Sequence, residues 1–150
     1  MSNVRPILLA EDNPNDIELV VAALHDAHLV NEILIARDGE EALDCLYRRG
    51  RFAGRTSAQP AVILLDLKMP KVDGLEALQR IRADTDLRTI PVVILTSSRE
   101  ESDLLRTYEL GINAYVVKPV DFSEFTGAVT KLGCFWALLN EPPPEKVAKS

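Results

Sequence analysis

The sequence has few cysteines, few aromatic residues and no long apolar run. Its two cysteines, Cys45 and Cys134, lie far apart in apolar helical patterns. This placement favours buried free thiols over a disulfide or a metal pair, and it suits a reducing compartment. No apolar run approaches the roughly 18 residues that a membrane-spanning helix needs, and the N-terminus lacks the pattern of a signal peptide. We therefore expect a cytoplasmic protein that does not enter a membrane.

Long basic segments and glycine-rich phosphate loops are also missing. The chain carries 17 Lys and Arg against 23 Asp and Glu, so its formal net charge is -6. A negative chain repels nucleic-acid phosphates, and the arginine-rich stretch of residues 48–55 is too short to offset that repulsion. We expect no direct nucleic-acid binding. No glycine-rich phosphate loop follows the first apolar run, which argues against a nucleotide-binding Rossmann enzyme.

Five short apolar runs recur along the chain and are separated by helical patterns. Their nearly continuous apolarity is typical of strands buried on both faces of a parallel sheet. The alternation of strands and helices predicts βαβ units, and hence a doubly wound α/β fold. The runs are Ile7–Ala10, Ile33–Ala36, Ala61–Leu65, Val92–Leu95 and Ala114–Val117.

The helical patterns differ in strength. The clearest apolar stripe is formed by Ile17, Val20, Val21 and Leu24. Such spacing places the apolar side chains on one face of a helix. Further patterns cover residues 39–49 and 75–81, a weaker stripe joins Leu104, Leu105 and Tyr108, and a last helix is expected from Asp121 or Ser123 to Trp136.

Two segments fall outside this alternation. Residues 48–60 are rich in Arg, Gly and Ser and are predicted to form an extended surface loop. Residues 140–150 contain three consecutive prolines and are predicted to be an extended or disordered tail. One domain is therefore expected over residues 5–139.

Polar residues follow four of the apolar runs directly. Because ligands bind beyond the carboxyl ends of parallel strands, these residues are expected to converge. They are Glu11 and Asp12 after the first run, Asp66 after the third, Thr96 after the fourth and Lys118 after the fifth. Carboxylates packed together repel one another unless a cation neutralises them, and hard oxygen ligands suit Mg²⁺.

This cluster also has the chemistry for phosphoryl transfer. A carboxylate such as Asp66 can act as a nucleophile and form an aspartyl phosphate. Asp12 and Asp66 are the expected direct Mg²⁺ ligands, while Lys118 and Thr96 could hold the other phosphoryl oxygens.

Each of these residues also has an ordinary structural interpretation. A lone aspartate at the end of a strand usually caps a helix or fixes a turn. Glu11 and Asp12 could serve the start of the first helix, where Asn13 and Pro14 form a cap. Lys118 could be a solvated lysine, and Thr96 a hydroxyl bonded to backbone. Only the phosphoryl-transfer interpretation explains all of them together.

The motifs ILLAEDN, LLDLKMPKVDG, VVILTSS and NAYVVKP, in this order, closely resemble those of the CheY-like receiver domains of bacterial response regulators. The match covers about residues 6–139. The resemblance implies a (βα)5 flavodoxin-like fold with a five-stranded parallel sheet in the order 2-1-3-4-5 and helices on both faces.

The resemblance also implies a role for each matching residue. Asp66 would be the phosphoacceptor, Asp12 the closer metal ligand and Glu11 an indirect one, with the main-chain carbonyl of Lys68 as a third protein ligand. Thr96 and Tyr115 would be the switch pair. A cis peptide bond is expected between Lys118 and Pro119.

The partner implied is a sensor histidine kinase that donates its phosphoryl group in the presence of Mg²⁺. The start of the chain, the long loop and the Cys134-Phe135-Trp136 end resemble the stand-alone regulators that partner bacterial phytochromes, so a bacteriophytochrome is the kinase this finer resemblance implies. Output would then pass in trans, to a downstream phosphotransfer or effector protein.

Regulators of that group often form homodimers through the face of the fourth and fifth helices. Phe125 and Trp136 could anchor such a face or pack in the core. His25 and His28 are given no role.

Two rival functions remain. A metal-dependent phosphohydrolase of the haloacid dehalogenase type would need a second aspartate two residues after the nucleophile, where this chain has Lys68. A constitutive binding module would keep the fold without the switch, but such degenerate receivers usually lose the acceptor, the acidic pair or the lysine. We therefore expect a protein that catalyses only its own phosphorylation and dephosphorylation, and is not otherwise an enzyme.

Overall fold

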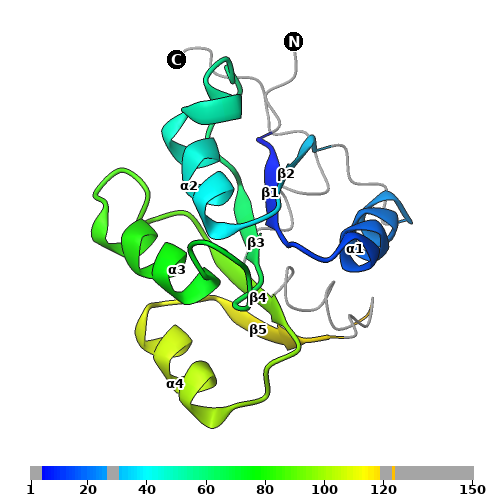
Figure 1. Cartoon of the computed structure of the whole chain (residues 1–150), viewed down its shortest axis with the longest axis vertical. Coiled ribbons are helices and arrows are strands. Elements are labelled where there is room, and N and C mark those ends of the chain that lie inside the picture. Colours follow the sequence, from blue (N-terminus) through cyan, green and yellow to red (C-terminus); the bar gives the residue numbers. More distant parts are fainter. Residues whose placement is uncertain (1–4, 27–30, 119–122, 124–150) are drawn as a thin grey trace, which may run out of the picture.

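The computed structural model describes residues 5–26, 31–118 and 123. Within them, five parallel strands form one sheet in the order β2-β1-β3-β4-β5. This is the predicted doubly wound fold with the predicted strand order (Figure 1). The strands are β1 (Ile7–Ala10), β2 (Ile33–Ala36), β3 (Val62–Leu65), β4 (Val92–Thr96) and β5 (Ala114–Val117).

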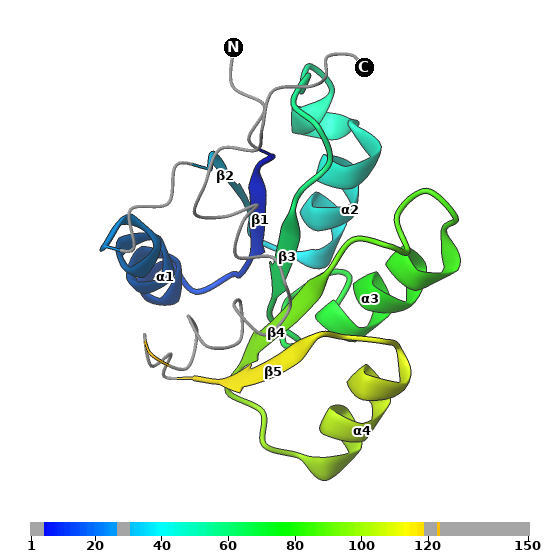
Figure 2. The same ribbon diagram turned by 180° about the vertical axis from the view of Figure 1, so that it is seen from behind.

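Helices lie on both faces of this sheet. Helices α2 and α3 cover one face and α1 covers the other, as the two opposite views show (Figures 1 and 2). The helices are α1 (Pro14–Asp26), α2 (Gly39–Tyr47), α3 (Gly74–Ala83) and α4 (Glu101–Glu109). The predicted last helix, the tail and Cys134 lie outside the described residues, apart from Ser123.

Alternate residues of the central strands point into two separate cores. Leu8 of β1 and Ile63 of β3 pack with α2 and α3, whereas Ile7 and Leu64 pack with α1. All four are completely buried, because a strand points successive side chains to opposite faces. This explains why β1 and β3 are apolar at every position.

Side-chain caps start three of the helices at the carboxyl edge of the sheet. Asn13 Oδ1 accepts the backbone N–H groups of Asn15 and Asp16 at the start of α1. Asp38 and Asp73 accept the N–H group three residues ahead in α2 and α3. Each cap satisfies backbone donors that the first helical turn leaves without partners. The predicted cap of α1 is therefore confirmed.

Two details of the sequence prediction are wrong. Ala61 precedes β3 and Thr96 belongs to β4, so both strand boundaries shift by one residue. The loop of residues 48–60 is not wholly extended, because it contains a 3₁₀ turn (Gly50–Phe52) whose Phe52 is buried. Buried aromatic surface anchors this segment to the core.

Helix α4 is predicted correctly, but its surroundings differ from those of the other helices. Its apolar stripe does not face the core: Leu105 is 61% exposed and Tyr108 is 51% exposed. The buried position belongs to Thr107, whose hydroxyl donates to the carbonyl oxygens of Asp103 and Leu104 within the helix. Periodicity identified the helix correctly, and the structure adds that its apolar stripe is exposed.

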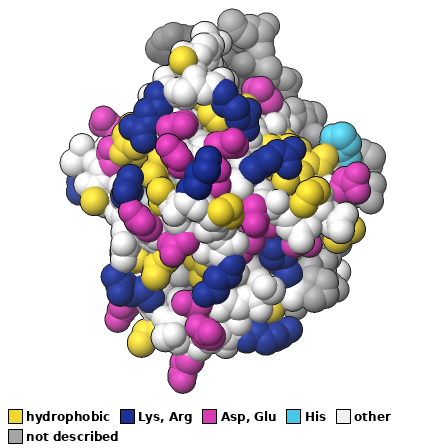
Figure 3. All heavy atoms as spheres, viewed as in Figure 1, with side chains coloured by type: hydrophobic (Ala, Val, Ile, Leu, Met, Phe, Trp, Pro, Cys, Tyr) yellow, Lys and Arg dark blue, Asp and Glu magenta, His cyan; other side chains and the backbone are white. Residues whose placement is uncertain are grey.

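Two expectations from composition can also be checked. None of the helices in the described ranges is long and apolar enough to cross a membrane. On the face seen in Figure 3, acidic and basic side chains are interspersed, without a large patch of one sign.

Candidate functional site

The carboxyl ends of four neighbouring strands bring the predicted polar residues together. Adjacent strands end in register, with Ala10 of β1 opposite Leu65 of β3. The next residues along the chain are therefore Glu11 and Asp66, at the same edge of the sheet. Thr96 ends β4 and Lys118 follows β5 at that edge, because Thr96 pairs with Val117. The expected convergence is confirmed for Glu11, Asp12, Asp66 and Lys118, and Thr96 lies at the same edge of the sheet.

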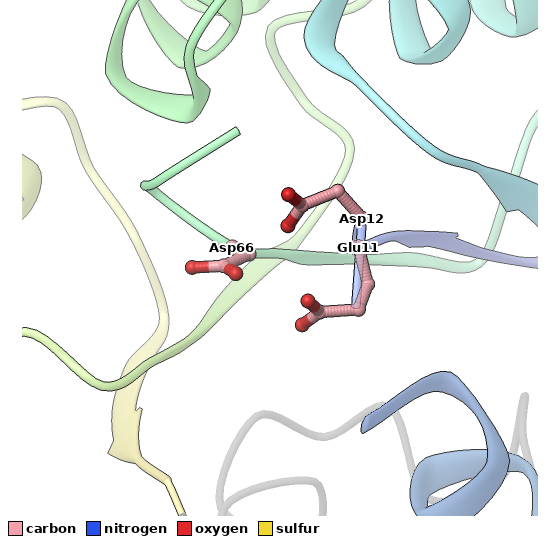
Figure 4. A group of neighbouring side chains, drawn as sticks. All are labelled: Glu11, Asp12 and Asp66. Carbon is pink, nitrogen blue, oxygen red and sulfur yellow. The ribbon is translucent and has the colours of Figure 1, made fainter. Parts of the chain in front are cut away.

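Three carboxylates form the acidic part of this site. Glu11, Asp12 and Asp66 each offer an oxygen atom, and these oxygens all lie within 4.8 Å of one another. Figure 4 shows the carboxylates of Glu11 and Asp12, from the end of β1, pointing to the same side as that of Asp66 from the end of β3. Glu11 and Asp66 are buried, whereas Asp12 is exposed. The trio is therefore open to solvent through Asp12.

Lys118 supplies the positive charge of the site. Its Nζ atom lies 2.7 Å from Glu11 Oε1, 2.8 Å from Asp16 Oδ2 and 3.1 Å from Asp66 Oδ2. The lysine side chain is only 10% exposed. It is therefore not the solvated surface lysine that its residue type alone suggests, because buried lysines need charged partners.

Burial and charge shift the proton affinities of this pair. Burial raises the pKa of Glu11 to about 7, even though its hydrogen bonds from Lys118 and from the backbone of Asn13 act in the opposite direction. Burial works against the charge of Lys118, but its hydrogen bonds to Asp16 and Glu11 prevail and raise its pKa above the ordinary value. Lys118 thus stays charged at neutral pH, while Glu11 is partly protonated.

Backbone contacts fix the orientation of Asp66. Its N–H group donates to the Ala10 carbonyl oxygen, and the Lys68 N–H group donates to Asp66 Oδ1 at 3.2 Å. Gly74, the first residue of α3, packs so closely that an added Cβ atom would lie 2.1 Å from the Asp66 carbonyl oxygen. Only glycine allows α3 to start this close to the end of β3.

A second network lies beside the acidic trio. The Thr96 hydroxyl oxygen accepts the Ser98 N–H group at 3.3 Å, and the half-buried Tyr115 donates its hydroxyl to the Ser98 carbonyl oxygen at 3.0 Å. The Ser98 hydroxyl donates to Asp103 at 2.6 Å, and Lys68 Nζ lies 3.5 Å from the same carboxylate. The predicted switch pair, Thr96 and Tyr115, is therefore connected through the loop between β4 and α4.

Asp16 is the site residue that sequence reasoning missed. It lies in the first turn of α1 and contacts Lys118 across 102 positions in sequence. Its spacing of four residues from Asp12 was a usable signal, since four residues make about one helical turn. That spacing alone does not reveal that β5 delivers a lysine to the same place.

Some predicted features are not tested by this geometry. Pro119, and with it the expected cis peptide bond, lies outside the described residues, as do His28, Phe125 and Trp136. The metal-ligand role of the Lys68 carbonyl stays a prediction. His25 is exposed on α1, and no role is assigned to it.

Comparison with known proteins agrees with this fold and site. The family model of the response regulator receiver domain matches residues 7–130. The chain belongs to this family. It is 39% identical over 130 residues to the response regulator Rcp1 of Synechocystis sp., covering 87% of each protein.

Two solved structures share more of their sequence with this chain than Rcp1 does. The chain is 60% identical to the bacteriophytochrome response regulator RtBRR, with a TM-score of 0.83 over 94% of this chain and 85% of the other. It is 61% identical to the bacteriophytochrome response regulator AtBRR, with a TM-score of 0.82 over 92% of this chain and 99% of the other. The likeness to regulators associated with phytochromes is therefore strong at the level of both sequence and structure.

The donor set of the acidic trio fits a divalent cation. Carboxylate oxygens are the ligands that Mg²⁺ and Mn²⁺ prefer, and three of them lie close enough here to share one ion. The Mn²⁺-bound form of Rcp1, 37% identical with a TM-score of 0.73 over 88% of this chain and 92% of the other, has the same fold.

Proposed function

We propose that this response regulator accepts a phosphoryl group on Asp66 from the phosphohistidine of a sensor histidine kinase, in a reaction that depends on Mg²⁺. The observation that carries the proposal is the contact of Lys118 Nζ with Asp66 Oδ2 at 3.1 Å, inside a cluster of carboxylates. A buried ammonium beside a carboxylate can stabilise the charge of an incoming phosphoryl group.

Asp66 is the best acceptor of the three carboxylates. Burial raises the pKa of Glu11 to about 7, which makes it a less effective nucleophile near neutral pH than an ordinary carboxylate. Asp12 is exposed, whereas Asp66 is buried and held by the Lys68 N–H group. A fixed, partly desolvated carboxylate can attack with less reorganisation of water.

The transfer itself requires one bond to form and one to break. An Asp66 carboxylate oxygen attacks phosphorus, the bond from phosphorus to the histidine nitrogen breaks, and the imidazole leaves with the electron pair. Lys118 donates to a phosphoryl oxygen, and Thr96, completely buried at the end of β4, is placed to donate its hydroxyl to another. These residues orient the group and balance its charge.

A Mg²⁺ ion held by Asp12 and Asp66, with Glu11 as an indirect partner, would neutralise negative charge on the transferring group. Asp12 leaves one side of the trio open to solvent, which suits an ion that retains several water ligands. The Lys68 carbonyl is the proposed third protein ligand.

The switch that follows would pass through Thr96. If its hydroxyl turns toward the phosphoryl group, the Ser98 N–H group loses its acceptor, and the loop that also holds the Tyr115 hydroxyl must rearrange. The surface of α4 and β5 would then change and act on a downstream protein in trans.

A bacteriophytochrome is the proposed kinase, because two bacteriophytochrome response regulators are 60% and 61% identical to this chain.

A homodimer through the α4 side is a further part of the proposal, supported by the exposed side chains of Leu105 and Tyr108. The phosphohydrolase alternative needs an aspartate two residues after the nucleophile. In this chain that residue is Lys68, which pairs with Asp103, so the alternative gains no support.

Transfer of radioactive phosphate from an autophosphorylated bacteriophytochrome kinase tests this function. The wild-type protein should be labelled with Mg²⁺ and not with excess chelator. Asp66→Asn should abolish labelling, whereas Asp86→Asn, at an exposed aspartate remote from the cluster, should leave it unchanged. Equal labelling of wild type and Asp66→Asn would refute Asp66 as the acceptor.

The dimer is tested separately. Leu105→Asp should shift the elution of a dimeric protein to that of a monomer in size-exclusion chromatography, because it puts a charge on an exposed apolar position of α4. An unchanged elution volume would exclude this face as the interface.

A further inference from the structure

The Lys118 ammonium group has no free hydrogen atom for a phosphoryl oxygen. It carries three N–H donors, and three carboxylates accept from it: Glu11 at 2.7 Å, Asp16 at 2.8 Å and Asp66 at 3.1 Å. If Asp66 is phosphorylated, Lys118 can donate to the phosphoryl group only by weakening one of these contacts.

The three contacts differ in how readily they can be given up. Glu11 is buried, with 2% of its side chain exposed, so its carboxylate would lose a charged partner without gaining water. Asp66 carries the phosphoryl group and stays beside the ammonium. The Asp16 side chain is 28% exposed and can be hydrated when it is released. Of the two carboxylates that phosphorylation leaves unmodified, Glu11 and Asp16, Asp16 is therefore the less costly partner for Lys118 to release.

We propose that Asp16 is a positioning residue that holds the Lys118 ammonium in the unphosphorylated protein and competes with the phosphoryl group for it. This inference rests on the proposed acceptor function of Asp66. It gives α1 a part in the reaction, because Asp16 belongs to the first turn of that helix. By this competition, Asp16 lowers the affinity of the site for a phosphoryl group.

Beryllofluoride, which imitates a phosphoryl group on aspartate, serves as the probe. Its affinity is measured by calorimetric titration in saturating Mg²⁺, for the full chain and for Asp16→Asn. Asparagine keeps the shape of the side chain but removes its charge, so the competing charge-assisted hydrogen bond is weakened. The affinity should rise by about 3- to 10-fold, the range expected when a competing charged hydrogen bond is lost.

Two comparisons separate competition for Lys118 from a general effect of charge. Glu18→Gln removes an equal charge from an exposed position of the same helix and should leave the affinity unchanged. In a Lys118→Met background, Asp16→Asn should have no effect, because the group for which Asp16 competes is gone. Asp16→Glu restores the charge and should bring the affinity back toward the wild-type value.

Each outcome decides the matter. Tighter binding by Asp16→Asn that disappears without Lys118 supports the inference. Unchanged or weaker binding overturns it, and so does tightening of equal size with Glu18→Gln or in the Lys118→Met background. If Lys118→Met does not fold, the Glu18→Gln and Asp16→Glu comparisons still decide the matter. Failure of the wild-type protein to bind beryllofluoride at all would overturn the proposed function itself, a result distinct from normal wild-type binding with no effect of Asp16→Asn.

Discussion

Replacing Gly74 by alanine should destabilise the protein and disturb the phosphorylation site together. The added Cβ atom would lie 2.1 Å from the Asp66 carbonyl oxygen and 2.7 Å from Leu67 Cα, both of them backbone atoms. An ordinary contact begins at 3.4 Å, so α3 and the end of β3 must separate by about 1.3 Å, the difference between 3.4 and 2.1. No flexible side chain can absorb this shift.

The expected cost follows from that geometry. Overpacking of a well-packed site costs about 1–3 kcal/mol, and a clash between two backbone segments belongs at the upper end of that range. The higher helix propensity of alanine returns up to about 1 kcal/mol. Gly74→Ala should therefore lower the free energy of unfolding by about 2–3 kcal/mol, and it should weaken Mg²⁺ binding because Asp66 is displaced.

Urea denaturation followed by circular dichroism measures the first effect, and calorimetric titration with Mg²⁺ measures the second. Gly54→Ala is the matched control, because an added Cβ atom there would have no neighbour within 4 Å. A Gly74→Ala protein as stable as the Gly54→Ala protein, with unchanged Mg²⁺ affinity, would refute the reasoning.

Three further predictions concern the charges and the frame of the site. Glu11→Gln should remove a pH dependence of stability. The folded-state pKa of Glu11, about 7, lies above its ordinary value of 4.5, so its contribution to stability is full below pH 4.5 and is lost as pH rises through 7. In metal-free protein, the unfolding free energy of the wild type relative to Glu11→Gln should fall by roughly 2–3 kcal/mol from pH 5 to pH 8, and a pH-independent difference would contradict the raised pKa. Arg82→Ala should cost about 2–4 kcal/mol in urea denaturation, because this guanidinium donates to four backbone carbonyl oxygens near the ends of α3 and α4. Arg80→Ala, which breaks only an exposed ion pair in the same helix, should cost less than about 0.5 kcal/mol, and equal costs would show that the four bonds of Arg82 add nothing. Mg²⁺ at 100 times its dissociation constant should raise the unfolding free energy by about 2.7 kcal/mol, and at the same Mg²⁺ concentration this gain should shrink strongly in Asp12→Asn, as thermal denaturation can show.

The sequence predicted the strands and the main site well for a physical reason. Strands buried on both faces must be apolar at every position, so β1 and β3 are visible in the sequence almost to the residue. Parallel strands end at one edge of the sheet. The residues that follow them, such as Asp66 and Lys118, could therefore be assigned to one site from the sequence alone. The order of the strands came from the resemblance to a family, because apolar runs carry no information about their neighbours.

Contacts between elements distant in sequence were harder to predict. Asp16 and Lys118 meet only because α1 and the end of β5 are placed side by side by the fold, and no local pattern records this. The stripe of α4 illustrates a second limit. Helical spacing shows that Leu105 and Tyr108 share a face, but only the tertiary structure shows that this face is exposed and that Thr107 is buried instead.

Identification of the phosphorylated residue tests the central claim most directly. The protein is treated with Mg²⁺ and a small acyl phosphate donor, and the acyl phosphate is then trapped by borohydride, which reduces a phosphorylated aspartate to homoserine. Peptide mass spectrometry should find homoserine at position 66, and none when Mg²⁺ is removed by chelator. Modification at Glu11 or Asp12 instead, or an unmodified Asp66 in a folded protein, would contradict the account.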